Sequence, residues 1–307
     1  MRYLPEGFLL SSEENQAALS APARLKAAFY GGRLLEGRAL LCDSMHNLHV
    51  DLGCMRGMIP REEGALGISD GTVRDIALIS RVNKPVVFRV LGFHTDAKGE
   101  PIALLSRKQV QQACREEYLA HLQPGDIIDA VVTHLEGFGA FCDIGAGLNA
   151  LLPVDCICVS RIPHPRARFS PGQRIKAVVR AIDERGRITL SHKELLGTWE
   201  ENSAAVQVGE TVSGIVRSVE SYGIFVELKP NLAGLAEYTW GVDPGAHASV
   251  YVKNILPERM KIKLILVDAF RADYPPEPMT YYIESGRLNR WVYSPPGSEK
   301  VIDSRFE

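Results

Sequence analysis

The sequence predicts a mainly β protein of three tandem five-stranded antiparallel barrels joined by short helical connectors. Short β-branched runs alternate with turns rich in Gly, Pro and Asp, and residues 124–193 show no long helical period. One arrangement of a strand, an aromatic pair and a glycine also recurs at a fixed distance along the chain. Short strands at this density are typical of closed barrels rather than of a βαβ unit.

Residues 124–193 contain the clearest copy of the barrel. Its runs of β-branched residues are bounded by Gly, Pro or charged turn residues. The expected strands are residues 127–135, 140–144, 150–152, 175–182 and 188–190. Five strands in about 70 residues predict one small barrel.

An aromatic pair, Phe138 and Phe141, stands between the first two expected strands. On a regular strand, two rings three positions apart point to opposite faces. Gly139 permits a bulge, which would turn both rings the same way. Two interpretations remain open at this point: both rings are buried in the core, or both lie on the surface.

Basic residues are concentrated in the second half of this copy. Residues 160–193 hold nine Arg or Lys against only Asp183 and Glu184. The nine are Arg161, Arg166, Arg168, Arg174, Lys176, Arg180, Arg185, Arg187 and Lys193. A charge run is usually a solvated face, but beside surface rings it is typical of single-stranded nucleic-acid binding.

Five short motifs in this copy resemble, in order and spacing, the S1 RNA-binding domain, the OB-fold module that is repeated in bacterial small-subunit ribosomal protein S1. The motifs are Gly125-Asp126, Phe138-Gly139-Ala140-Phe141, Ala150-Leu151, Gly172-Gln173-Arg174-Ile175, and Asp183 with Arg187-Ile188-Thr189-Leu190-Ser191. The resemblance implies an RNA-binding face that carries Phe138, Phe141, Asp183 and Arg187. Pro153 replaces a histidine of the family pattern.

A second copy of the same pattern occupies residues 207–270. Gly209 and Gly223 are separated by 14 positions, as are Gly125 and Gly139, so the chain contains an internal repeat. By resemblance, Tyr222 and Phe225 are expected to stack RNA bases. Glu237 stands at the histidine position, and Lys261 stands near the arginine position, where lysine offers a point charge rather than a planar fork.

A divergent copy is predicted at residues 33–108. His46 and His49 align with the ring positions, and Ile102 aligns with the arginine. Histidine can stack on a base, but these replacements favour a packing or protein-docking module over an RNA-binding one.

The remaining segments are interpreted as connectors and ends. A helix capped at Ser20, with Pro22 in its first turn, should lead into the first barrel. Trp199 should anchor the junction before the last barrel.

The C-terminal extension should add two short strands, within 279–283 and 288–293, to the last barrel; RNA contact through Arg287, Arg290 and Trp291 is the alternative. The predicted parts are 1–32 (helical lead-in), 33–108 (divergent barrel), 109–122 (helix), 123–196 (RNA-binding barrel), 197–206 (connector), 207–270 (RNA-binding barrel) and 271–307 (extension).

Composition restricts the class of protein. The formal net charge is -2, so affinity for a polyanion must come from a local patch. The sequence has no apolar run of 18 residues, no signal-peptide pattern and no C-x-x-C pair, so we expect a cytoplasmic protein without membrane association. Cys156, Cys158 and His164 lack a convincing fourth metal ligand. We find no catalytic motif, and expect no enzyme activity, metal or cofactor.

The resemblance implies that the chain binds single-stranded RNA, in particular mRNA, and acts in translation near the small ribosomal subunit. The second connector and the C-terminal extension also resemble the shorter, clostridial-type members of the family. The alternative is a protein-docking scaffold, or a regulatory RNA-binding factor that acts with a polymerase or ribonuclease. The divergent first copy and the net acidity favour this alternative.

Overall fold

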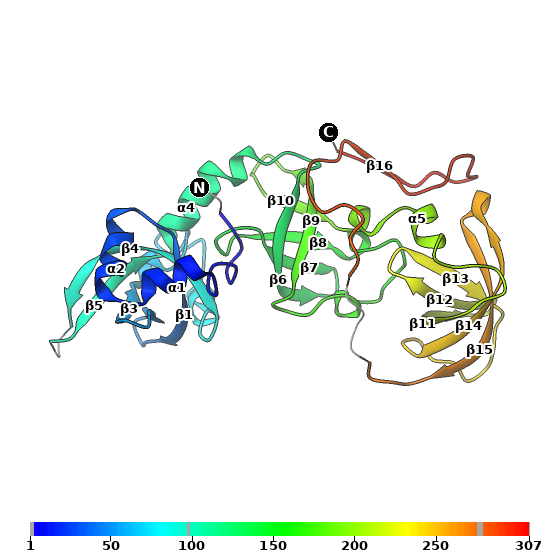
Figure 1. Cartoon of the computed structure of the whole chain (residues 1–307), viewed down its shortest axis with the longest axis horizontal. Helices are drawn as coiled ribbons and strands as arrows, with labels where there is room; N and C mark the ends of the chain where they lie inside the picture. The colour runs from blue at the N-terminus through cyan, green and yellow to red at the C-terminus, as the bar shows by residue number, and fades with distance from the viewer. Residues whose placement is uncertain (1–2, 97–98, 275–278, 307) are drawn as a thin grey trace. The chain divides into compact units, whose positions relative to one another are not determined.

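The strands form three closed five-stranded barrels that follow one another along the chain (Figure 1). The computed structural model describes residues 3–96, 99–274 and 279–306. The prediction of three tandem barrels is confirmed. One pair in each barrel runs parallel, however: β3 with β5, β8 with β10 and β13 with β15. A closed barrel with an odd number of strands cannot alternate direction all the way round, so a purely antiparallel barrel was the wrong expectation.

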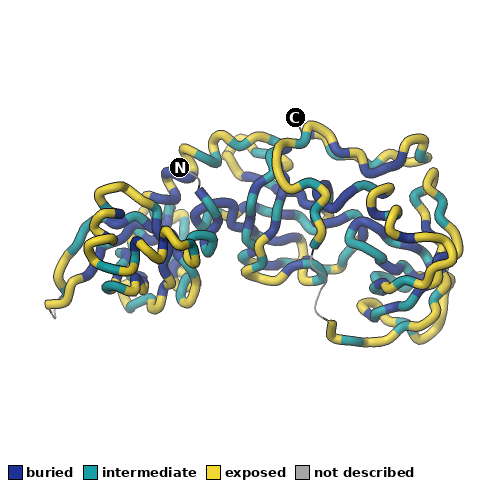
Figure 2. Tube along the Cα trace, viewed as in Figure 1, coloured by how far each residue is buried: buried dark blue, intermediate teal, exposed yellow. Residues whose placement is uncertain are grey.

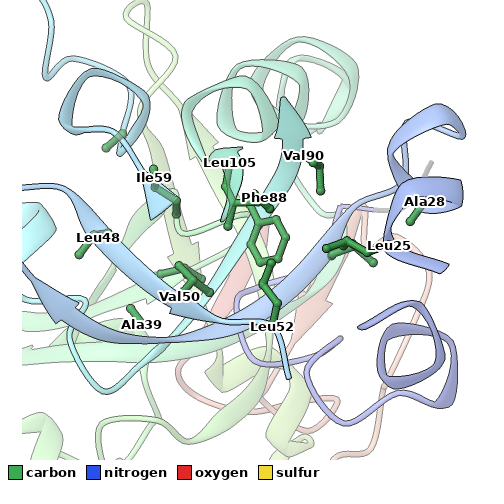
Figure 3. Packing of buried hydrophobic residues seen from close by; sticks show 14 of the residues in the cluster. Leu25, Ala28, Ala39, Leu48, Val50, Leu52, Ile59, Phe88, Val90 and Leu105 are labelled. Atoms are coloured by element: carbon green, nitrogen blue, oxygen red, sulfur yellow. The ribbon is translucent and has the colours of Figure 1, made fainter. Parts of the chain in front are cut away.

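The first barrel encloses a core of aliphatic side chains around one phenylalanine. Its strands are β1 (Leu35–Cys42), β2 (Leu48–Asp51), β3 (Arg56–Ile59), β4 (Pro85–Thr95) and β5 (Pro101–Ser106), with η1 (Arg61–Glu63) and α3 (Ile76–Ile79) between β3 and β4. Phe88 is fully buried at the centre of this cluster, and Leu25 and Ala28 of α2 (Pro22–Tyr30) belong to the same cluster (Figure 3). Helix α2 is therefore part of the barrel's core.

The N-terminal segment contains two helices where one was expected. Helix α1 (Glu13–Leu19) begins at Ser12, whose hydroxyl accepts a hydrogen bond from the backbone N–H of Asn15. Ser20 is the C-cap of α1 and does not cap α2. Pro22 does lie in the first turn of α2, as expected, but the N-cap of that helix is Ala21, which has no side chain that can accept a hydrogen bond.

The second barrel follows a connecting helix. Helix α4 (Lys108–Glu117) ends five residues before the expected boundary and is followed by a 3-10 turn, η2 (Leu119–His121). The strands are β6 (Ile127–Glu136), β7 (Gly139–Asp143), β8 (Asn149–Pro153), β9 (Arg174–Ile182) and β10 (Ile188–Ser191). Three 3-10 turns complete this region: η3 (Val154–Cys156), η4 (Pro165–Ala167) and η5 (Lys193–Leu196).

The third barrel is preceded by a short helix, α5 (Trp199–Ser203), whose start is fixed by a capping box between Thr198 and Glu201. Trp199 is 3% exposed and packs in the core of this barrel, in agreement with the anchoring role expected for it. The strands are β11 (Thr211–Glu220), β12 (Gly223–Lys229), β13 (Leu232–Ala236), β14 (His247–Leu256) and β15 (Lys261–Phe270), with η6 (Pro257–Arg259) before the last strand.

The C-terminal extension forms a hairpin of β16 (Arg290–Val292) and β17 (Asp303–Arg305). Trp291 packs in the core of the third barrel, whereas Leu288 and Phe306 pack with Val178 of the second. A strand within 288–293 was expected correctly. The strand expected within 279–283 was wrong, and residues 275–278 and 307 of the extension lie outside the described residues.

The chain divides into two compact units. The first comprises Met1–Leu122, Asp129–Val131 and Asp143–Asn149, and the second holds the rest, so most of the second barrel shares a unit with the third. Buried stretches lie along the strands of each barrel, and many of the exposed stretches lie in the turns, as Figure 2 shows. Among the described residues, no helix combines the length and apolar character needed to cross a lipid bilayer.

The first unit contains a buried cluster of charged groups. The guanidinium of Arg107 donates hydrogen bonds to both carboxylate oxygens of Glu6, at 2.6 and 3.0 Å, and the backbone N–H of Glu6 donates to Asp143 at 2.8 Å. Burial, with the nearby Glu6 carboxylate, raises the pKa of Asp143 to about 7. Asp143 is 2% exposed, so its carboxylate does not contribute to the surface of the barrel.

Candidate nucleic-acid interface

Phe138 and Phe141 lie together on the surface of the second barrel. Phe138 lies in the turn between β6 and β7, and Phe141 lies in β7. Their ring centroids are 6.1 Å apart, with the planes almost perpendicular at 89°. Phe138 is 58% exposed and Phe141 is half-buried, so the pair is not part of the core.

Gly139 has a different role from the one expected. A Cβ atom on Gly139 would lie 2.5 Å from the carbonyl oxygen of Leu152, so glycine lets β8 approach β7 closely. The two rings lie together because Phe138 belongs to the turn rather than to the strand. The alternation that would separate them applies only within a strand.

His134 extends the aromatic surface next to Phe141. Its ring stacks on that of Phe141, with centroids 6.5 Å apart and planes inclined by 29°, and its Nε2 lies 2.6 Å from the Glu136 carboxylate. His134 is exposed, although strict alternation from the buried Val132 would turn residue 134 inward. Sequence reasoning missed it because the alternation breaks at Thr133.

Asp183 and Arg187 form an ion pair across the exposed turn between β9 and β10. Arg187 Nε donates to Asp183 Oδ2 at 2.6 Å, and Asp183 Oδ1 accepts the backbone N–H groups of Arg185 and Arg187. Hydrogen bonds from Arg187 to its carboxylate lower the pKa of Asp183. The carboxylate therefore orients the guanidinium, which remains 75% exposed.

The third barrel repeats the ring geometry. Tyr222, in the turn before β12, and Phe225, within β12, have centroids 6.1 Å apart and planes at 87°. Tyr222 is 68% exposed and Phe225 is half-buried. Gly223 allows the same close approach of two strands as Gly139, because a Cβ atom on Gly223 would lie 2.6 Å from the Ala236 carbonyl oxygen.

Strand register places the cations of the two barrels at equivalent positions. In the third barrel, Leu235 pairs with Lys263 across the parallel strands, and Lys261 lies two residues earlier. In the second barrel, Leu151 pairs with Thr189, and Arg187 lies two residues earlier. Lys261 thus occupies the place of Arg187, as expected. The sequence analysis missed Lys263, which is exposed on the same face of β15 as Lys261.

Two further exposed aromatic residues follow β13 in the third barrel. Tyr238 is 52% exposed and Trp240 is 88% exposed. Tyr238 lies two residues beyond Ala236, which pairs with Ile224, so it stands at the same end of this strand pair as Tyr222. Neither belongs to a motif of the repeat, which explains why the sequence analysis passed over them.

In the first barrel, histidines stand at the two ring positions. His46 lies in a turn, with Nδ1 3.5 Å from the Asp75 carboxylate, and His49 lies in β2, with Nε2 3.1 Å from Asp43. Ile102, which aligns with the arginine position, is 8% exposed. Both histidines are engaged with acidic groups of their own barrel.

Some residues expected near RNA are committed to the fold. The side chain of Arg168 is only 7% exposed and pairs with Glu227, so the basic run does not form one face. Trp291 is 5% exposed, and Arg290 pairs with Asp303 at 2.9 Å, so the alternative of an RNA contact through Trp291 is wrong. Among the residues that the structure describes, no group of three or more His, Cys, Asp or Glu side chains is placed to hold a metal ion.

The second and third barrels thus share one arrangement of two rings and a cation on a closed five-stranded barrel. Residues 121–193, which include the second barrel, match the family described as "S1 RNA binding domain".

The similarity extends beyond this barrel to bacterial small ribosomal subunit proteins. The chain is 29% identical over 259 residues to small ribosomal subunit protein bS1 of Rhizobium meliloti, covering 78% of this chain and 44% of the relative. It is 33% identical over 178 residues to bS1 of Staphylococcus aureus, covering 52% and 45%. A bS1 homolog of Bacillus cereus is 27% identical over 218 residues, covering 61% and 57%. The chain thus spans about half the length of these relatives.

Proposed function

We propose that the chain binds single-stranded RNA through the ring pairs of residues 123–196 and 207–270. One observation carries the proposal: both barrels present an exposed ring in a turn, a second ring 6.1 Å away, and a cation at the equivalent position at the start of the closing strand. Exposed rings stack unpaired bases, and cations contact the phosphates between them. The RNA-binding side chains are Phe138, Phe141, Asp183, Arg187, Tyr222, Phe225 and Lys261, with His134 and Lys263 added from their placement.

We infer that the RNA is mRNA and that the protein acts in the cytoplasm with the small ribosomal subunit. The support is similarity to proteins named as small ribosomal subunit components. Sedimentation of ribosomes from a lysate, with and without RNase, tests this inference. Cosedimentation that persists after RNase indicates a protein contact with the ribosome, and loss of cosedimentation indicates attachment through RNA alone.

Truncation of the exposed ring tests RNA binding directly. Phe138→Ala should weaken binding of single-stranded RNA by about 1–3 kcal/mol and leave the melting temperature nearly unchanged. Leu152→Ala, a change in the fully buried core of the same barrel, should instead cost about 2–5 kcal/mol of folding stability. Equal RNA affinity of Phe138→Ala and the wild type would contradict the proposal.

A second candidate function, protein docking, concerns the first barrel alone. Leu41 is 53% exposed and pairs with His49, which occupies the inner-ring position, and Met45 in the adjoining turn is 73% exposed. Exposed aliphatic groups thus stand beside His46 and His49, the two positions where the other barrels carry aromatic rings. Apolar surface of this kind favours contact with a protein. Leu41→Glu should abolish binding of a protein that docks on this surface, without changing the affinity of the chain for an isolated RNA.

A further inference from the structure

A cavity of about 580 Å³ lies beside the rings of the third barrel, and side chains of both the second and third barrels line it. Tyr222, Phe225 and Arg217 come from the third barrel. Arg161, Ile162 and Pro163 come from the segment between η3 and η4 of the second. The cavity therefore combines aromatic, aliphatic and cationic groups with one carboxylate, that of Glu220. The first three are the groups that meet a nucleotide in single-stranded RNA.

The second-barrel segment is fixed to the third barrel by hydrogen bonds. The backbone N–H of Val159 donates to Asn231 Oδ1 at 2.9 Å, and that of Ser160 donates to the Pro230 carbonyl at 3.2 Å. Asn231 is fully buried, and its amide also donates to the carbonyls of Lys193 and Gly197, at 2.8 and 2.9 Å. One asparagine thus positions the wall of the cavity.

A buried ion cluster holds the other end of the segment. Arg168, just after η4, donates to the Glu227 carboxylate, and Arg217 donates to both oxygens of the same carboxylate at 2.9 Å. Two guanidinium groups share one carboxylate, so the cluster carries a net charge of about +1 next to the cavity, where low solvent exposure strengthens its field. Arg161 adds a second positive charge to the cavity lining and Glu220 a negative one, so the net charge of about +1 still favours an anionic or electronegative occupant.

We propose that this cavity is a composite subsite for one unpaired nucleotide of RNA, completed by residues of the second barrel; the inference rests on the RNA binding proposed above. The base stacks on Tyr222 and Phe225, and Ile162 and Pro163 cover its other face. The adjoining phosphate meets Arg161, an exposed guanidinium that has no hydrogen bond or ion pair with any residue that the structure describes. The third barrel thus binds RNA with the help of its neighbour.

The test uses the full chain and a fluorescent oligouridylate of about twelve nucleotides, a length within the range that OB folds cover. Arg161→Ala and Ile162→Ala each remove one lining side chain. Arg166→Ala is the matched control, because Arg166, five residues further along in η4, is also an exposed arginine but does not line the cavity. Tyr222→Ala and Phe138→Ala report on the two ring pairs.

Arg161→Ala and Ile162→Ala should each weaken binding about threefold to tenfold, and Arg166→Ala less than twofold. Arg161→Ala should also reduce the slope of log affinity against log salt by about 0.7, the value for one phosphate contact on a single strand. The double variant Arg161→Ala with Tyr222→Ala should lose less RNA affinity than the product of the two single-variant losses, because both changes empty one subsite. Combined with Phe138→Ala the effects should multiply.

Two results would overturn the inference. If Arg161→Ala and Ile162→Ala match Arg166→Ala while Tyr222→Ala still weakens binding, then the rings bind RNA without the second barrel. If neither Tyr222→Ala nor Phe138→Ala changes RNA affinity, then the proposed function fails, and this subsite fails with it.

Discussion

Glu227 is the residue whose replacement tests most directly how the second barrel is held on the third. Its carboxylate is buried between Arg168 of one barrel and Arg217 of the other. Glu227→Gln removes the negative charge and retains the size of the side chain. Two buried guanidinium groups would then lie close together without a counter-charge.

The expected cost follows from the burial of all three groups. Side-chain exposure is 4% for Glu227, 7% for Arg168 and 11% for Arg217, so solvent screens the cluster little. Removal of one partner from a buried ion pair costs about 3–5 kcal/mol, since the remaining charge is left uncompensated. For a unit of about 180 residues, this lowers the melting temperature by roughly 6–20 °C.

Two assays measure the effect. Thermal unfolding by circular dichroism reports stability, and limited trypsin digestion reports release of the segment that contains Arg161 and Arg166. Glu227→Gln should melt earlier and be cleaved faster in this segment than Glu258→Gln, the same change at an exposed position of the same barrel. If the two variants melt together and are cleaved at the same rate, then the ion cluster does not hold the barrels in place.

Four other predictions concern pH, the C-terminal hairpin and salt. Burial raises the pKa of Glu36 to about 7 from 4.5. The stability that Glu36 contributes is therefore full below pH 4.5 and is lost as pH rises through 7. Glu36→Gln should flatten this part of the pH dependence of the free energy of unfolding. Burial lowers the pKa of His192 to about 4 from 6.5, so its contribution is present above pH 6.5 and is lost as pH falls through 4; His192→Gln should reduce that acid sensitivity. Trp291→Ala should cost about 3–5 kcal/mol of stability, measured by urea unfolding, with RNA affinity of the folded protein unchanged. RNA affinity should fall with salt on a slope that corresponds to a few phosphate contacts, and a salt-independent titration would contradict the role of the cations.

Local sequence pattern determined the barrels and the location of the ring pairs. Alternating β-branched residues, turn glycines and the equal spacing from Gly125 to Gly139 and from Gly209 to Gly223 are signals within a few residues of one another. They predicted all five strands of the second barrel to within about two residues. The RNA-binding role of those rings stays a prediction.

Only the tertiary structure decided which side chains are free to meet a ligand. Phe138 is exposed because it lies in a turn. Trp291 lies in an equally aromatic and basic stretch, but it packs in the core of the third barrel. In the sequence, Arg168 cannot be distinguished from the other arginines of the basic run. In the structure it forms a buried ion pair with Glu227, 59 residues away in the chain. Burial and pairing of this kind depend on contacts between residues far apart in the chain, which composition and periodicity do not record.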